Sequence, residues 1–64
     1  MILVNGKRED IVGMTVSQYL EREGYKEGRI AVEYNGALLP RAEYSITTLL
    51  SGDRIEIVHF VGGG

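Results

Sequence analysis

Few side chains in this sequence of 64 residues are of a type and spacing that could do chemistry. The sequence has no cysteine, so it offers no thiol nucleophile and no thiolate ligand for a metal ion. Its one histidine, His59, has no serine or carboxylate at a spacing that would predict a catalytic triad. The carboxylates are scattered along the chain and are typical of a solvated surface: Glu9, Asp10, Glu21, Glu23, Glu27, Glu33, Glu43, Asp53 and Glu56. We therefore expect no catalytic side chain and no metal site.

The other candidate for chemistry is the end of the sequence, Gly62-Gly63-Gly64, which follows an apolar, β-prone run. Glycine has no Cβ and loses the most conformational freedom on ordering, so this run is predicted to be a flexible tail. Such a thread, ending in a free carboxylate, could enter a channel too narrow for any other residue. The alternative interpretation is a frayed terminus or a remnant of cloning.

Length and charge restrict the class of protein further. A chain of 7.1 kDa has room for one domain with a single small core. A net charge of −2 and a pI near 5.2 argue against a nucleic-acid-binding protein. The sequence contains no signal-peptide pattern and no apolar run near the roughly 18 residues that a membrane span needs. We therefore expect a cytoplasmic protein without membrane contact.

The first part of the sequence predicts a β-hairpin followed by one helix. Ile2-Leu3-Val4 is β-prone, and Asn5-Gly6 favours a type I′ turn, in which both central residues need positive φ. The returning strand is expected to run from Lys7 to Ile11 or Val12. Thr15 and Gln18 then have the spacing of a capping box.

The predicted helix covers residues 16–23, because Gly24 stands where a left-handed residue would end it. Val16, Tyr19 and Leu20 mark its buried face, and we assign Tyr19 to packing.

The second part of the sequence predicts three more strands. Residues 30–34 alternate in polarity, Asn35-Gly36 predicts a second tight turn, and a small strand at residues 37–39 ends at Pro40. Residues 41–51 are expected to be irregular, with a helical turn at residues 46–50. The last strand is expected to begin at Arg54. The apolar residues expected to close one end of the core are Tyr44, Ile46, Leu49 and Leu50.

This order of elements predicts an α+β fold, the ubiquitin-like β-grasp, with one main helix packed on one face of a four- to five-stranded mixed sheet. The first and last strands would be parallel neighbours at its centre. Residues 1–61 would form this single domain, and residues 62–64 its flexible glycine tail.

The last strand also predicts a docking surface. If Ile55 and Ile57 face the helix, Val58 and Phe60 lie on the open face of the sheet, with Ala31 beside them. Exposed apolar side chains rimmed by charges suggest a partner-docking surface. The alternatives are a register shifted by one residue, or a C-terminal segment that covers these side chains.

Several stretches of this chain together form a recognisable pattern: Ile2-Leu3-Val4-Asn5-Gly6, Thr15-Val16 before a helix with Leu20, Val32-Glu33-Tyr34-Asn35-Gly36, Leu39-Pro40-Arg41, Gly52-Asp53-Arg54-Ile55-Glu56-Ile57-Val58 and the glycine end. Together they resemble the ThiS family of bacterial sulfur carriers in thiamine biosynthesis, within the wider ThiS/MoaD β-grasp group. The resemblance covers essentially the whole chain.

The resemblance implies that the chemistry takes place at Gly64. An E1-like, ThiF-like adenylyltransferase would adenylate its carboxylate with ATP, and the product would become a thiocarboxylate. The sulfur would come from a donor such as a cysteine desulfurase, and thiazole synthase (ThiG-like) would receive it. Gly62 and Gly63 would carry Gly64 into the partners' active sites. The chain would then be a protein co-substrate, not an enzyme, and would bind no cofactor itself.

Three alternatives remain open at this point. The same chemistry could serve another pathway, as in the small subunit of molybdopterin synthase or a carrier for cysteine biosynthesis. A ubiquitin-like modifier of lysine side chains would also end in glycine. A β-grasp nucleic-acid-binding domain would need a basic stripe, which the seven dispersed Lys and Arg residues do not predict.

Overall fold

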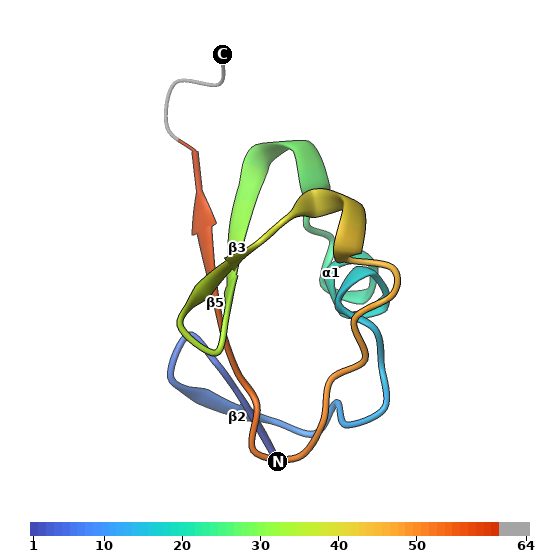
Figure 1. The fold of residues 1–64 in the computed structure, drawn as a ribbon, viewed down its shortest axis with the longest axis vertical. Helices are drawn as coiled ribbons and strands as arrows, with labels where there is room; N and C mark the ends of the chain where they lie inside the picture. The colour runs from blue at the N-terminus through green and yellow to red at the C-terminus, as the bar shows by residue number, and fades with distance from the viewer. Residues whose placement is uncertain (61–64) are drawn as a thin grey trace.

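The computed structural model describes residues 1–60, which form a five-stranded sheet and one α-helix (Figure 1). The elements are β1 (Ile2–Val4), β2 (Lys7–Glu9), α1 (Val16–Glu23), β3 (Ile30–Tyr34), β4 (Ala37–Leu39) and β5 (Arg54–His59), with short 3-10 helices η1 (Glu27–Arg29) and η2 (Arg41–Glu43). None of the helices in this described part is long and apolar enough to cross a membrane.

The last strand, β5, lies at the centre of the sheet. The strand order is β2-β1-β5-β3-β4, with β5 parallel to β1 and antiparallel to β3. Figure 1 shows α1 and the segment after η2 on one side of this sheet. This mixed sheet with one helix confirms the predicted α+β, β-grasp arrangement, including the parallel pairing of the first and last strands.

Both Asn-Gly turns have the predicted backbone conformation. Asn5 and Gly6 have φ of 49° and 82°, and Asn35 and Gly36 have φ of 51° and 89°, as a type I′ turn requires. The returning strand, however, is shorter than predicted, since β2 ends at Glu9.

The chain leaves the sheet after β2 because its backbone groups find other partners. The Gly13 N–H donates to the Leu49 carbonyl (2.8 Å), and the Leu49 N–H donates to the Met14 carbonyl (2.8 Å). This path carries Ile11 into the core and leaves Val12 exposed. Neither residue belongs to a strand.

Helix α1 has the boundaries that its capping residues predict. The Gln18 N–H donates to Thr15 Oγ1 (3.1 Å), and the Thr15 N–H donates to Gln18 Oε1 (2.9 Å), which completes the capping box. Gly24, with φ of 81°, ends the helix in the left-handed region. Tyr19 is buried as predicted, and this burial raises the pKa of its hydroxyl to about 12. The phenol is therefore neutral at physiological pH.

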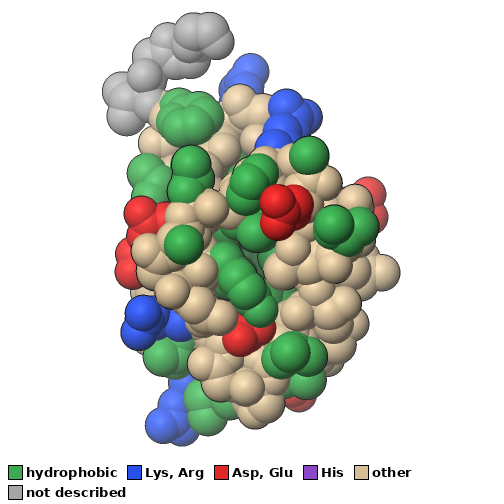
Figure 2. Space-filling model, in the orientation of Figure 1, with side chains coloured by type: hydrophobic (Ala, Val, Ile, Leu, Met, Phe, Trp, Pro, Cys, Tyr) green, Lys and Arg blue, Asp and Glu red, His purple; other side chains and the backbone are tan. Residues whose placement is uncertain are grey.

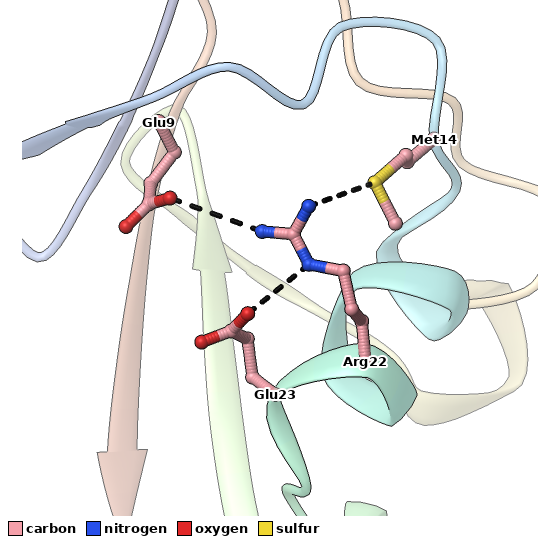
Figure 3. A network of polar contacts seen from close by, with 4 residues as sticks. All are labelled: Glu9, Met14, Arg22 and Glu23. Atoms are coloured by element: carbon pink, nitrogen blue, oxygen red, sulfur yellow. Dashed lines mark hydrogen bonds and ion pairs between the residues drawn. The ribbon is translucent and has the colours of Figure 1, made fainter.

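Arg22, in the last turn of α1, ties the helix to the first hairpin (Figure 3). Its Nε lies 3.1 Å from Glu23 Oε2, its Nη2 lies 3.9 Å from Glu9 Oε1, and its Nη1 lies 4.0 Å from Met14 Sδ. A cation near the C-terminal end of a helix also interacts favourably with the helix dipole. Because these pairs are exposed to water, each stabilises the fold only slightly.

The core fills the space between α1 and the sheet. Its buried side chains are Ile2, Val4, Ile11, Val16, Tyr19, Leu20, Ile30, Val32, Leu39, Tyr44, Leu49, Ile55 and Ile57. Burial of a large aliphatic side chain contributes about 1.5–3 kcal/mol, so this set dominates the stability of a small domain.

The segment before β5 differs from the prediction in two ways. Its helical turn is η2 and does not lie at residues 46–50. Tyr44 and Leu49 are buried as predicted, but Ile46 and Leu50 are 75% and 59% exposed, so their assignment to the core was wrong. Ile46 lies in the turn after η2, where its N–H donates to the Glu43 carbonyl (3.2 Å). Leu50 follows an extended stretch: the Val16 N–H donates to the Thr47 carbonyl, and alternation past this point turns Leu49 inward and Leu50 outward.

Candidate functional site

The residues predicted to carry the chemistry, Gly62, Gly63 and Gly64, lie outside the described residues. The structure does describe how the chain approaches them, because β5 ends at His59 and Phe60 follows. The Phe60 N–H donates to the Arg29 carbonyl (3.0 Å), which extends the antiparallel pairing one residue beyond β5. The central strand of the sheet therefore leads directly toward the glycines.

Side chains alternate along β5 as the sequence predicts. Ile55 and Ile57 are buried against the helix side, whereas Val58 and Phe60 are 55% and 58% exposed. Ala31 pairs directly with Val58 across the β3–β5 ladder. The structure thus brings the three predicted docking residues together on the open face and excludes the alternative register. Their role in docking stays a prediction.

Leu38, on edge strand β4, adds to this apolar surface and was not singled out from the sequence. It is 70% exposed and pairs with Glu33, while its neighbour Leu39 is buried. The signal that could have identified it is the alternation of the short strand, since an inward Leu39 requires an outward Leu38. We call Ala31, Leu38, Val58 and Phe60 together the open-face patch.

A groove of about 280 Å³ connects part of this patch to η2. It is lined by Ala31, Leu38 and Phe60 of the patch, together with Pro40 and Arg41. Figure 2 shows hydrophobic side chains gathered near the end of β5. Apolar side chains that remain exposed together on a small protein commonly mark a binding surface.

Two carboxylates lie directly opposite each other beside the open-face patch. Glu33 pairs with Glu56 across β3 and β5, and both are exposed. Asn35 with Arg54 and Arg29 with Phe60 are joined by backbone hydrogen bonds. Hydrogen-bonded pairs recur at every second residue of an antiparallel ladder, so Glu33 and Glu56 also form a hydrogen-bonded pair. The Cα atoms of such a pair lie about 5.5 Å apart.

The two carboxylates have no cation partner among residues 1–60. The ion pairs in this part of the chain join Arg22 to Glu9 and Glu23, and Arg41 to Glu27. Arg54 precedes Glu56 on the same face, but its Nη2 lies over the second turn, 4.0 Å from where a Cβ on Gly36 would stand. Like charges directly opposite each other destabilise a sheet.

Both hairpin asparagines position β5 with their side chains. The Ile57 N–H donates to Asn5 Oδ1 (2.7 Å), and Asn5 Nδ2 donates to the Ile57 carbonyl (3.4 Å). This amide replaces the backbone of β1, which ends at Val4. On the other side, the Arg54 N–H donates to Asn35 Oδ1 (2.8 Å). Sequence reasoning identified these asparagines only as turn residues.

Asp53 fixes the start of β5. Its carboxylate accepts hydrogen bonds from the Tyr34 hydroxyl (2.5 Å), Asn35 Nδ2 (3.1 Å) and the Leu50 N–H (2.8 Å). Burial opposes ionisation of Asp53, but these hydrogen bonds together outweigh it and hold the pKa of the carboxyl below its usual value. The hydrogen bond that the Tyr34 hydroxyl donates to Asp53 also raises the pKa of that hydroxyl.

His59 lies at the exposed end of β5, as expected for a surface residue. Its ring packs against Tyr25, with ring centroids 5.5 Å apart and planes tilted by 37°. Within residues 1–60, no three His, Cys, Asp or Glu side chains come together in a group that could hold a metal ion. The observed contact of His59 is therefore a packing contact at the end of the sheet.

The comparisons with known proteins agree with this architecture. The ThiS family matches residues 2–64 of the chain. The crystal structure of the thiamine biosynthesis protein ThiS from Geobacter metallireducens superimposes with a TM-score of 0.77 at 30% identity, and covers 98% of this chain and 97% of that one. An NMR structure of a thiamine biosynthesis protein from the same organism gives a TM-score of 0.74 at 30% identity, over 98% of this chain and 86% of that one.

Two curated relatives carry the name thiazole synthase. The protein from Paramagnetospirillum magneticum is 34% identical and that from Magnetococcus marinus is 38% identical, each over 64 residues and 98% of this chain. The chain spans only 20% of the length of each of them. Since the family match covers nearly every residue and the fold agrees with solved members, this chain belongs to the ThiS family.

Proposed function

We propose that this protein is a sulfur carrier of thiamine biosynthesis that transports sulfur on the carboxyl group of Gly64. The observation that carries the proposal is the family match over residues 2–64, which includes β5 and the glycines that follow it. The similarity to thiamine biosynthesis proteins and to proteins named thiazole synthase supports thiazole formation as the pathway.

The proposed chemistry has two steps, both catalysed by an E1-like adenylyltransferase. A carboxylate oxygen of Gly64 first attacks the α-phosphorus of ATP, and pyrophosphate leaves. Hydrosulfide, derived by reduction from the persulfide of a donor such as a cysteine desulfurase, then attacks the carbonyl carbon of the acyl adenylate. The bond to AMP breaks, and AMP, a proton and the Gly64 thiocarboxylate are formed. Neither of these two steps needs an oxidant or reductant. A cysteine desulfurase holds its sulfur as a persulfide, however, so a thiol would first reduce that persulfide, release hydrosulfide and itself be oxidised to a disulfide. Thiazole synthase would then take up the sulfur.

The scaffold would contribute binding rather than catalysis. Glycine alone allows the chain end to enter a confined site sterically, and ordering each residue costs about 1–2 kcal/mol. The exposed open-face patch, on the strand that precedes the glycines, is the surface that could offset this cost by docking. The chain is therefore proposed to act as a co-substrate of its partner enzymes.

Intact-mass spectrometry tests the proposal directly. The protein ending at Gly64 is incubated with ATP, a ThiF-like adenylyltransferase and sodium sulfide. We expect a mass gain equal to replacement of one oxygen by sulfur, which fragmentation should place on Gly64. The gain should disappear without ATP and in a variant that lacks residues 63 and 64.

Transfer to the next partner supplies the second half of the test. The sulfur-loaded protein is then mixed with thiazole synthase and its substrates. We expect the protein to regain the mass of its carboxylate form as thiazole is produced. If the complete mixture produced no sulfur-loaded protein, the proposed function would be wrong.

A further inference from the structure

The open face carries an unusual combination of apolar and charged side chains. The open-face patch borders Glu33 and Glu56, two exposed carboxylates that face each other across β3 and β5. Leu38 pairs with Glu33, and Val58 follows Glu56 on the same face of β5. The apolar residues therefore lie on two sides of a concentrated negative charge.

We infer that this face binds a protein surface on which an arginine, surrounded by apolar side chains, inserts between Glu33 and Glu56. Charge complementarity is the argument for this occupant. Neither carboxylate has a cation partner within residues 1–60, and Arg54 is directed over the turn at Gly36. An arriving cation would relieve the repulsion between the two carboxylates and be held by both of them.

The geometry favours arginine over lysine as that cation. The guanidinium group is planar, carries five N–H donors in a fixed fork and can bind two carboxylate groups at once. It is also more weakly hydrated than an ammonium group, so it enters an apolar surface such as that of Leu38 and Val58 at lower cost. A partner lacking this cation would leave two carboxylates buried and unpaired, which opposes binding.

The inference rests on the proposed function, because it assigns this surface to the E1-like adenylyltransferase. That enzyme is the first partner of a sulfur carrier, and every later step depends on its binding. Glu33 and Glu56 would then serve to recognise this enzyme, although in the free domain their like charges oppose the pairing of β3 with β5.

The test uses the full chain and a ThiF-like adenylyltransferase without ATP, with binding measured by calorimetry. We expect Glu33→Gln and Glu56→Gln each to weaken binding about tenfold, because removing one member of a close interfacial charge pair speeds dissociation. Glu21→Gln is the matched control: Glu21 is exposed on α1, which packs against the opposite face. Added salt should weaken binding of the wild-type chain more than that of the two variants.

Thermal unfolding of the same variants separates recognition from folding. We expect Glu56→Gln to raise the melting temperature, because the repulsion disappears, while it lowers affinity. Weaker binding with a lower melting temperature would overturn the inference, since damage to the fold would then explain it. Unchanged binding of both variants would also overturn it.

A double-mutant cycle tests the identity of the cation. An arginine of the adenylyltransferase whose replacement by alanine removes the effect of Glu56→Gln is the partner residue. If no arginine couples in this way, the assignment to arginine is wrong. The mass experiment tests the proposed function independently of these binding measurements. The proposed function is wrong if the wild-type chain acquires no sulfur there.

Discussion

At the residue scale, Asp53 shows how one side chain joins segments that are distant in sequence. Its carboxylate accepts from Tyr34 and Asn35, at the β3–β4 turn, and from the Leu50 backbone, in the segment before β5. These contacts set where β5 begins and therefore which of its side chains reach the open face. Neighbouring carboxylates on the surface have no comparable set of donors in the described residues.

The lowered pKa of Asp53 predicts a stability change with pH. A group whose pKa is lower in the folded protein stabilises the fold above its unfolded pKa, near 3.8, and loses this contribution as pH falls through the folded value. We expect Asp53→Asn to lower the urea midpoint at neutral pH and to flatten its decline in acid. Asp10→Asn, in the exposed segment after β2, is the control. Parallel acid profiles for wild type and Asp53→Asn would contradict the assignment.

At the element scale, β5 is held on both sides by turn residues as well as by strands. The Asn5 amide bonds to both backbone groups of Ile57, and Asn35 Oδ1 accepts from the Arg54 N–H. The strand pairing of β1 with β5 covers Arg54 and Ile55, so the Asn5 amide extends the support of β5 on that side. The Asn5 amide of the first hairpin therefore helps to hold β5 at Ile57, next to Val58.

Replacement of Asn5 tests this second role apart from the turn itself. Asn5→Gly keeps a residue that tolerates positive φ but removes two hydrogen bonds, so we expect a loss of about 1–2 kcal/mol in unfolding free energy. Asn5→Asp should cost more, because a carboxylate oxygen would replace the donor that faces the Ile57 carbonyl. Denaturant unfolding measures both variants. If Asn5→Gly were as stable as wild type, the amide would contribute nothing beyond the turn.

At the scale of the whole molecule, the two faces of the sheet differ in what they bury and expose. One face, with α1, contains the buried core, and the other exposes the open-face patch on the strand that leads to the glycines. Loss of a core side chain should unfold so small a domain, whereas loss of a patch side chain should affect partner binding alone. Stability and function are therefore expected to respond to different substitutions.

Phe60→Ala tests this separation. We expect a change in unfolding free energy within about 0.5 kcal/mol, because the side chain is largely exposed, together with weaker binding to the adenylyltransferase. Ile46→Ala is the matched control: Ile46 is exposed near the N-terminus of α1, away from the open face, and should leave binding unchanged. Calorimetry and denaturant unfolding measure the two effects. If Phe60→Ala bound the adenylyltransferase with the affinity of wild type, the open-face patch would not be part of the docking surface.

The sequence alone was enough to predict the local structure wherever neighbouring residues determine the backbone conformation. The Asn-Gly turns, the Thr15–Gln18 capping box and the glycine that ends α1 depend on φ preferences and on hydrogen bonds within a few residues. The alternation of β5 likewise predicted that Val58 and Phe60 lie on the open face. These signals, added in order along the chain, predicted the α+β fold.

Apart from the predicted pairing of the first and last strands, only the tertiary structure decided which distant segments meet. The exposure of Leu50 follows from pairing of its segment with the N-terminus of α1, and periodicity within that segment does not show this pairing. The opposition of Glu33 and Glu56 depends in the same way on the register between β3 and β5. Register is set by the combined packing of the whole sheet on its core, and so the charge pattern of the open face becomes visible only in the folded molecule.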